Sequence, residues 1–147
     1  MRKILSLKTI WLFILYAILD VICVGLGMGV PFICILLGLL VGWVIIKRMT
    51  DNLAEPKLIL RRILVGAGLT SAFTCLMMVI IWGIGLIDLS TSNFDIANYG
   101  IPMILYKPVA SLIGWMVLMI LVSPLLQFLL TLFAAHLTWL VRLARKV

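Results

Sequence analysis

The stretch TIWLFILYAILDVICVG, residues 9–25, decides the fold, because it carries one charged side chain, Asp20, among seventeen residues. A helix needs about 20 predominantly apolar residues to cross the hydrocarbon layer of a membrane, with a range of about 17–25. Three later runs have the same character, at residues 30–46, 63–87 and 109–140. We therefore predict an all-α integral membrane protein, a bundle of four transmembrane helices that forms a single domain over residues 1–147.

The composition excludes an ordinary soluble domain. Hydrophobic residues make up 65% of the chain and charged residues 12%, whereas a soluble domain has about 45–50% apolar and about 25% charged residues. The formal net charge is +7, which in a soluble protein would suggest nucleic acid. Here the basic residues flank the apolar runs, so we expect lipid as the partner and no nucleic acid.

The basic residues also predict the orientation. Eleven of the twelve Lys and Arg residues lie in the N-terminal segment, in the segment 47–62 and near the C-terminus. Because Lys and Arg accumulate on the cytoplasmic side, we predict that both termini and a loop over residues 47–62 are cytoplasmic, next to anionic lipid headgroups. Residues 88–108 then form the outer loop. We expect a multi-pass protein of the plasma (inner) membrane of a prokaryote.

Glycine and proline predict two special features of the helices. The segment GLGMGVP, residues 25–31, separates the first two spans and predicts a tight hairpin, because glycine permits a positive φ where the backbone reverses. Proline suits the first turn of the helix that follows. A proline inside the last span, Pro124, predicts a kink. The hairpin residues are Gly25, Gly27, Gly29 and Pro31.

Two polar residues inside the spans are the strongest candidates for a site. A carboxylate at membrane depth costs about 2.5–3.5 kcal/mol on insertion scales, so Asp20 needs a reason to be there. One interpretation is a proton or cation site that faces an outer vestibule lined by Asp88 and Asp95, since carboxylate clusters favour cations. The other is a structural carboxylate that accepts backbone N–H bonds from the glycine turn. Gln127, close to Pro124, predicts either a polar lining of a pathway or a partner for freed backbone groups.

Stripes of small residues predict close helix packing, because such residues let helix backbones approach one another in lipid. One stripe lies on the second span, and two adjacent stripes lie on the third. The sequence leaves open whether they pack inside the bundle or between copies of the chain. The stripes are Cys34, Gly38 and Gly42; Gly66, Thr70 and Thr74; and Ala67, Ser71 and Cys75.

Two classes of function remain. We find no nucleophile–base arrangement, no phosphate-binding loop and no Cys/His cluster, so we expect no enzymatic activity, no metal and no cofactor. The first class is a small transporter or channel component with Asp20 as a proton- or cation-responsive group. The alternative is a non-catalytic accessory, assembly or scaffold subunit, which docks on a larger membrane partner, or on further copies of itself, through its small-residue stripes and its basic face.

The predicted orientation can be tested by labelling a cysteine introduced at Asn93. Because residues 88–108 are expected outside, an impermeant thiol reagent should label this site in intact cells. Labelling that appears only after lysis would contradict the cytoplasmic placement of the termini.

Overall fold

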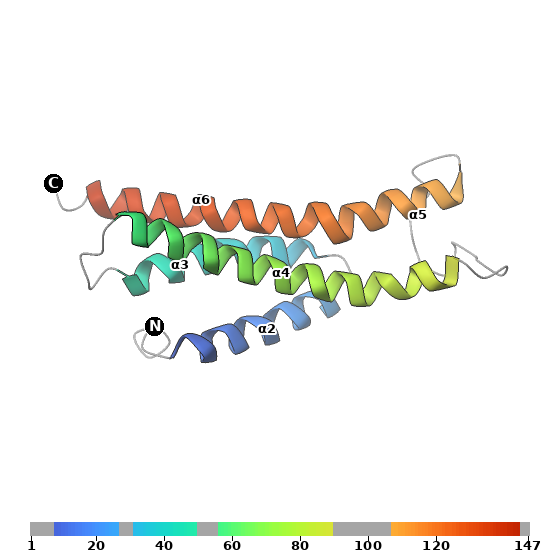
Figure 1. Ribbon diagram of the computed structural model, residues 1–147, viewed down its shortest axis with the longest axis horizontal. Coiled ribbons are helices and arrows are strands. Elements are labelled where there is room, and N and C mark those ends of the chain that lie inside the picture. Colours follow the sequence, from blue (N-terminus) through green and yellow to red (C-terminus); the bar gives the residue numbers. More distant parts are fainter. Residues whose placement is uncertain (1–7, 27–30, 50–55, 90–106, 145–147) are drawn as a thin grey trace.

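The computed structural model describes residues 8–26, 31–49, 56–89 and 107–144, and in these ranges the chain is almost entirely helical (Figure 1). The last membrane-crossing unit is a continuous helix built of three consecutive parts, the middle one π-helical. The elements are α2 (Thr9–Leu26), α3 (Phe32–Met49), α4 (Pro56–Leu89), α5 (Pro108–Val117), η2 (Leu118–Val122) and α6 (Ser123–Ala144).

The structure confirms four helices that are long and apolar enough to cross a membrane. By length and composition the chain is therefore a multi-pass membrane protein. The apolar helical stretches are Thr9–Leu26, Phe32–Met49, Lys57–Gly83 and Val109–Ala144.

Helical residues extend into both predicted loop segments between the spans, and the start of α4 agrees with the preference of proline for the first turn of a helix. Helix α3 continues through Lys47 and Arg48, and α4 begins at Pro56, so much of the segment 47–62 is helical. Likewise, Asp88 belongs to the last turn of α4. Lys47 and Arg48 favour the extension of α3, because cations in the last turn of a helix complement its dipole. The connections 50–55 and 90–106 lie outside the described residues.

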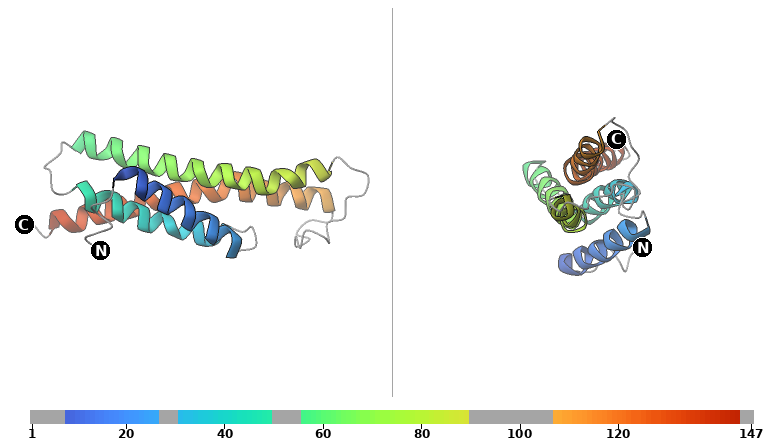
Figure 2. Two further views of the ribbon diagram at one scale, coloured as in Figure 1. Left: turned by 90° about the horizontal axis from the view of Figure 1, so that it is seen from below. Right: turned by 90° about the vertical axis from the view of Figure 1, so that its right-hand side faces the viewer.

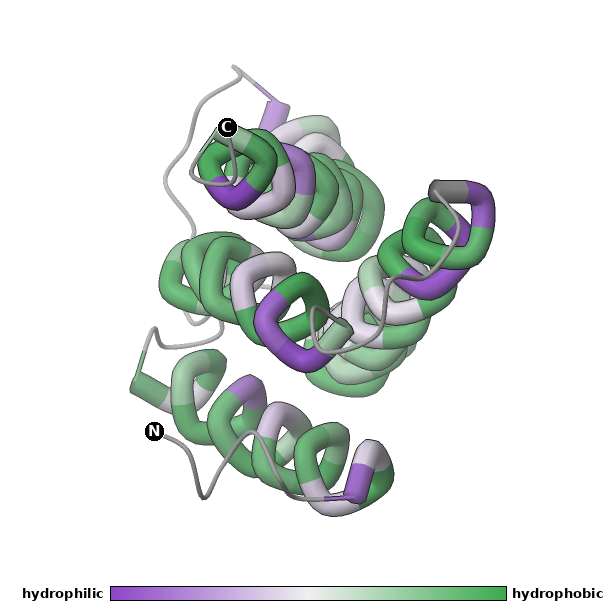
Figure 3. Tube along the Cα trace, turned by 90° about the vertical axis from the view of Figure 1, so that its left-hand side faces the viewer, coloured by the Kyte–Doolittle hydropathy of each residue, from purple (hydrophilic) through white to green (hydrophobic). Residues whose placement is uncertain are grey.

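The helices run antiparallel to their chain neighbours (Figures 1 and 2). The start of α2, the end of α3, the start of α4 and the end of α6 therefore lie at the same end of the bundle. Figure 3 looks onto this end and shows its helix termini to be the more hydrophilic parts. We call it the basic end; that it faces the cytoplasm remains a prediction. Its described basic residues are Lys8, Lys47, Arg48, Lys57, Arg61, Arg62 and Arg142.

The bundle has apolar side chains on its outside and polar ones within. Leu40, Leu121 and Phe133 are 59%, 62% and 60% exposed, an arrangement that water would disfavour but lipid requires. The interior, in contrast, contains side chains that an ordinary soluble core avoids. The buried polar and charged residues are Asp20, Thr70, Ser71, Thr74, Ser111, Ser123, Gln127 and Thr131.

Aromatic and basic side chains mark the depth of the apolar layer. The Lys47 ammonium lies 5.7 Å from the ring centroid of Trp43, a combination typical of the membrane interface. On α4, Arg62 and Trp82 are about twenty residues apart, or about 30 Å of helix. This matches the thickness of a hydrocarbon core, about 30 Å. When Arg62 and Trp82 are taken as the two limits of the apolar layer, Thr74 lies about 12 Å from the limit at Trp82, within the layer.

Helices α3 and α6 make the most extensive contact in the bundle. A Cβ atom at Gly38 would lie 2.7 Å from the carbonyl oxygen of Gln127, and one at Gly42 would lie 2.8 Å from the Ala135 amide nitrogen and collide with the Thr131 carbonyl oxygen. Only glycine allows this approach, so the α3 stripe packs inside the chain. The buried residues of α3 are Cys34, Gly38, Gly42 and Ile46.

The two stripes of α4 face different neighbours. On the first stripe, Gly66 abuts the Ile45 side chain of α3, and the Thr74 hydroxyl bonds to α2. On the second stripe, the Ser71 hydroxyl donates to the Pro124 carbonyl of α6. Because adjacent residues point about 100° apart around a helix, α4 can contact both neighbours at the same level.

The segment before Pro124 contains the π-helical turn η2. Pro124 has no N–H, so the carbonyl of Ile120, one α-helical turn earlier, lacks its usual donor. The Cys75 thiol of α4 lies 3.4 Å from this carbonyl oxygen and donates to it. The backbone N–H and the hydroxyl of Ser123 both bond to the Leu118 carbonyl, the hydroxyl at 2.9 Å. The sequence predicted a kink at Pro124; what the structure shows there is a change to π-helical hydrogen bonding.

The α3–α6 contact can be tested with a glycine pair. Gly42→Ala places a methyl group against the backbone of Thr131 and Ala135, which have to move. We expect a loss of about 1–3 kcal/mol in the free energy of unfolding, measured by unfolding in mixed detergent micelles. Gly68→Ala is the matched control, because a Cβ there meets nothing within 4 Å. Equal stability of the two variants would contradict the packing.

Candidate functional site

Asp20 lies on the buried face of α2, and its side chain has no exposed surface. Tyr16 precedes it by four residues, so the two side chains lie on the same face of the helix. The Tyr16 hydroxyl lies 3.3 Å from Asp20 Oδ1 and is positioned to donate to it. The carboxyl group is therefore turned into the bundle, away from lipid.

The Tyr16 hydroxyl joins three helices. It lies 2.8 Å from the Thr74 hydroxyl of α4 and 3.1 Å from the Thr70 carbonyl oxygen of the same helix. From α6, Gln127 Nε2 donates to it at 2.5 Å. Since one hydroxyl has one proton, its contacts with Asp20, Thr70 and Thr74 are alternative destinations for that proton.

Thr74 provides the second contact to the carboxyl group. Its hydroxyl lies 3.1 Å from Asp20 Oδ1 and 3.2 Å from Oδ2. The same hydroxyl lies 3.3 Å from the Thr70 carbonyl oxygen, one helical turn earlier. We call Tyr16, Asp20, Thr70, Thr74 and Gln127 the polar cluster.

Only one of the two polar atoms in the side-chain amide of Gln127 has a hydrogen-bond partner in the polar cluster. Its side chain is fully buried, and its backbone carbonyl accepts the Thr131 hydroxyl at 2.8 Å. The side-chain oxygen Oε1, however, is buried without a hydrogen-bond partner among the described residues. A buried amide oxygen without a donor costs about 1–3 kcal/mol, so this atom calls for an explanation.

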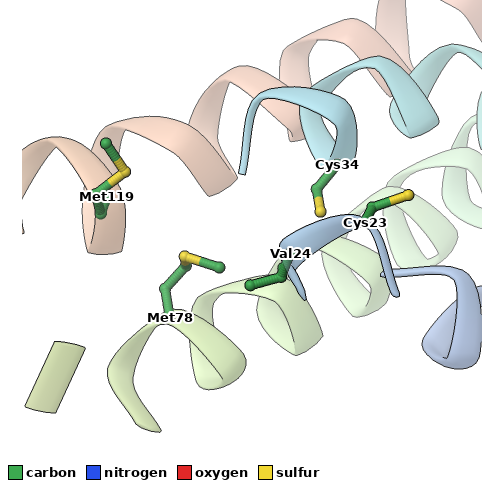
Figure 4. Close-up of a cluster of buried hydrophobic side chains, with 5 residues drawn as sticks. All are labelled: Cys23, Val24, Cys34, Met78 and Met119. Carbon is green, nitrogen blue, oxygen red and sulfur yellow. The ribbon is translucent and has the colours of Figure 1, made fainter. Parts of the chain in front are cut away.

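Apolar side chains lie next to the polar cluster, on the side where α4 continues to Trp82. Val24 follows Asp20 by one turn on α2, and Met78 follows Thr74 by one turn on α4. Figure 4 shows the side chains of Met78 and Val24 lying toward each other. We call this group the methionine cluster; its residues are Cys23, Val24, Cys34, Met78 and Met119.

A second apolar group lies toward the basic end. It brings together α3, α4 and α6, and Trp139 packs against it. We call it the isoleucine cluster; its buried residues are Ile46, Ile63 and Ala135. The polar cluster is thus enclosed along the bundle axis by apolar side chains on both sides.

The described groups that bond to the Asp20 side chain carry no charge. Among the described residues, the hydroxyls of Tyr16 and Thr74 lie within hydrogen-bond distance of its carboxyl oxygens, and the Cys34 thiol also interacts with the Asp20 side chain. The Cys34 thiol contacts the backbone carbonyl of Asp20 at 3.6 Å. A charged carboxylate in this layer would therefore be stabilised by dipoles alone, which compensate only part of the loss of hydration.

Comparison of the chain with known protein families, with curated proteins and with solved structures finds no match.

The residues proposed from the sequence fall into three groups in the structure. Asp20 and Gln127 come together through the Tyr16 hydroxyl. Thr70 and Thr74, expected only to pack, also provide hydrogen-bonding groups. The remaining candidates are placed elsewhere: Gly25 is exposed at the end of α2 and Pro31 is buried before α3, while Gly27, Gly29, Asp95 and the side chain of Asp88 lie outside the described residues.

The structure assigns the Asp20 carboxyl partners that sequence reasoning missed. The glycine turn, one expected source of donors, falls on residues 27–30, which lie outside the described residues. Among the described residues, the donors are side chains of α2 and α4. The contact between Tyr16 and Asp20 could have been predicted from the sequence, because Tyr16 lies four residues before Asp20 in the same span. The contact between Thr74 and Asp20 could not, since it depends on how α2 and α4 are rotated against each other.

The junction between Tyr16 and Gln127 can be tested by a double-mutant cycle. Tyr16→Phe leaves Gln127 Nε2 without its acceptor and should cost about 1–3 kcal/mol in the free energy of unfolding. Gln127→Leu in the same chain removes the unpaired amide, so the double variant should lose less than the sum of the single variants, by about 0.5 kcal/mol or more.

Unfolding in mixed detergent micelles provides the measurement for this cycle. Thr138→Ala is the control, because the Thr138 hydroxyl bonds, within the described residues, to the Ala134 carbonyl of its own helix. Strict additivity of the Tyr16 and Gln127 substitutions would show that the two residues are not coupled.

Proposed function

We propose that this chain is a small transporter or channel component in which Asp20 responds to a proton or a cation. The observation that carries the proposal is a fully buried carboxyl group on a helix apolar enough to cross a membrane, hydrogen-bonded to the hydroxyls of Tyr16 and Thr74. Ionisable residues inside membrane segments occur where ions or protons pass. A solely structural role would be served as well by an amide, which carries no charge.

The energetics support a role that depends on charge. An ionised carboxylate at this depth is costly unless a positive charge is nearby. In the described residues no cationic side chain bonds to Asp20, so a proton or a cation has to supply the compensation. Gain or loss of that species alters the hydrogen bonds of Tyr16 and Thr74.

A change in the charge of Asp20 affects three helices, because the hydrogen bonds of the polar cluster join them. Tyr16 belongs to α2, Thr74 to α4 and Gln127 to α6. In contrast to the close α3–α6 pair, α2 makes few contacts with α3 and α4. We propose that α2 moves when the charge of Asp20 changes, while α3, α4 and α6 stay together. Movement of α2 would carry Val24 away from Met78 and open the methionine cluster.

The alternative function, an accessory subunit, is supported by the basic end. Lys57, Arg61 and Arg62 are exposed on α4, where a partner with an acidic surface or anionic lipid can reach them. The glycines of α3, in contrast, already pack against α6 and are not free for another protein. The small-residue stripe of α3, which the accessory role was expected to use for docking, is therefore already occupied by α6.

Flux measurements in proteoliposomes test the transport proposal. The wild-type protein should dissipate an imposed proton or sodium gradient, and Asp20→Asn should reduce this flux to the level of empty liposomes, because the amide carries no charge. Circular dichroism should show unchanged helix content. Gly68→Ala should retain the flux, because a Cβ atom at Gly68 meets nothing within 4 Å.

Two outcomes would contradict the transport proposal. One is equal flux for wild-type protein and Asp20→Asn. The other is a wild-type protein that shows no flux and is recovered from its membrane only with a larger partner, which would favour the accessory role.

A further inference from the structure

We propose that the polar cluster binds a small monovalent metal cation, of the size and charge of Na⁺, with Gln127 Oε1 as one of its ligands. This inference rests on the proposed function and assigns its ion. The coordinating groups are the Asp20 carboxylate, the Thr74 hydroxyl oxygen and the Gln127 amide oxygen. Binding displaces the carboxyl proton into bulk water, and the Tyr16 hydroxyl turns its own hydrogen bond from Asp20 to the Thr70 carbonyl oxygen.

The donor set selects the chemical class of ion. Carboxylate, hydroxyl and amide oxygens are the ligands of hard cations. The cluster holds one carboxylate, so a monovalent cation gives a neutral complex with Asp20. A divalent ion would leave a net positive charge in the apolar layer, which is costly. The combination of oxygen ligands and one negative charge therefore favours an alkali cation.

The hydrogen bonds have a second arrangement that frees the carboxylate. In the first, Thr74 and Tyr16 both donate to Asp20. In the second, Thr74 donates to the Tyr16 oxygen at 2.8 Å and Tyr16 donates to the Thr70 carbonyl at 3.1 Å. The second arrangement requires no movement of the heavy atoms, and in it neither hydroxyl proton points toward Asp20. Both carboxylate oxygens are then available to a cation.

The unpartnered oxygen of Gln127 is the observation that points to a ligand. The amide group is buried and touches the cluster through Nε2, which contacts the Tyr16 hydroxyl. Oε1 belongs to the same planar amide as Nε2, so it borders the cluster in the orientation present. No described group donates to Oε1, and a cation satisfies this oxygen directly.

The size of the ion follows from the packing. The polar groups already lie within hydrogen-bond distance of one another, between 2.5 and 3.3 Å. The backbone of α6 beside Gln127 is held against Gly38, where even a methyl group has no room. A small ion such as Na⁺ or Li⁺ requires less expansion of the cluster than K⁺ does.

Thermal unfolding in detergent with NaCl, KCl or choline chloride at equal ionic strength tests this assignment. A ligand that binds only the folded protein raises its unfolding temperature. NaCl should therefore raise the midpoint relative to choline chloride, and KCl should raise it less. Gln127→Leu should weaken the apparent Na⁺ affinity about tenfold or more, as expected for loss of one oxygen to a charged partner.

A matched pair separates ligand loss from damage to the fold. Thr74→Ser retains a hydroxyl and should keep the Na⁺ response, whereas Thr74→Val has nearly the same shape as threonine, lacks the hydroxyl and should lose it. Gly68→Ala should behave as the wild type. A wild-type midpoint that is the same in NaCl and choline chloride, or an undiminished response in Thr74→Val and Asp20→Asn, would overturn the assignment.

The outcome distinguishes the inference from the proposed function. Asp20-dependent proton flux without a Na⁺ response would overturn the cation site and leave the transport proposal standing. An Asp20-dependent Na⁺ response without flux of either ion would support the cation site and contradict transport.

Discussion

A carboxyl group inside the hydrocarbon layer has to be surrounded by polar partners, and the arrangement of this bundle depends on that constraint. Asp20 is turned inward on α2 and meets hydroxyl groups of α2 and α4, while the Tyr16 hydroxyl extends the contact to Gln127 of α6. Hydrophobic attraction does not distinguish helix from lipid in a membrane, so polar contacts and close packing determine how the helices associate. The polar cluster fixes the rotation of α2, whose other contacts are few.

Close packing provides the frame for these contacts. Gly38 and Gly42 bring α3 against the backbone of α6, and the Ser71 hydroxyl joins α4 to the carbonyl of Pro124. The missing N–H of Pro124 leaves a carbonyl that Cys75 contacts. The irregular backbone before Pro124 is thus satisfied by α4, as irregular backbone at membrane depth has to be. Gln127 follows directly after this segment, so the packing determines where its amide group lies.

The sequence predicted the four helices well and the contacts between them poorly. Length and apolarity define a membrane helix locally, so the spans could be read from the sequence alone. Asp20 and Gln127 stood out because polar residues in apolar runs are rare. That they share the Tyr16 hydroxyl depends on the rotation of three helices, which no single span encodes. The π-helical form of the segment before Pro124 could not be predicted either, since a proline indicates that the helix is irregular but does not determine the geometry of the irregularity.

Asp20 is a buried carboxyl group, and we propose that its charge changes with the bound ion. Infrared difference spectroscopy of the protein in liposomes, exchanged between choline and sodium buffers, measures this most directly. Sodium should displace the carboxyl proton into the buffer and so convert a protonated carboxyl band into carboxylate bands, and Asp20→Asn should remove this change. A spectrum without a carboxyl signal, or with the same signal in Asp20→Asn, would contradict this proposal.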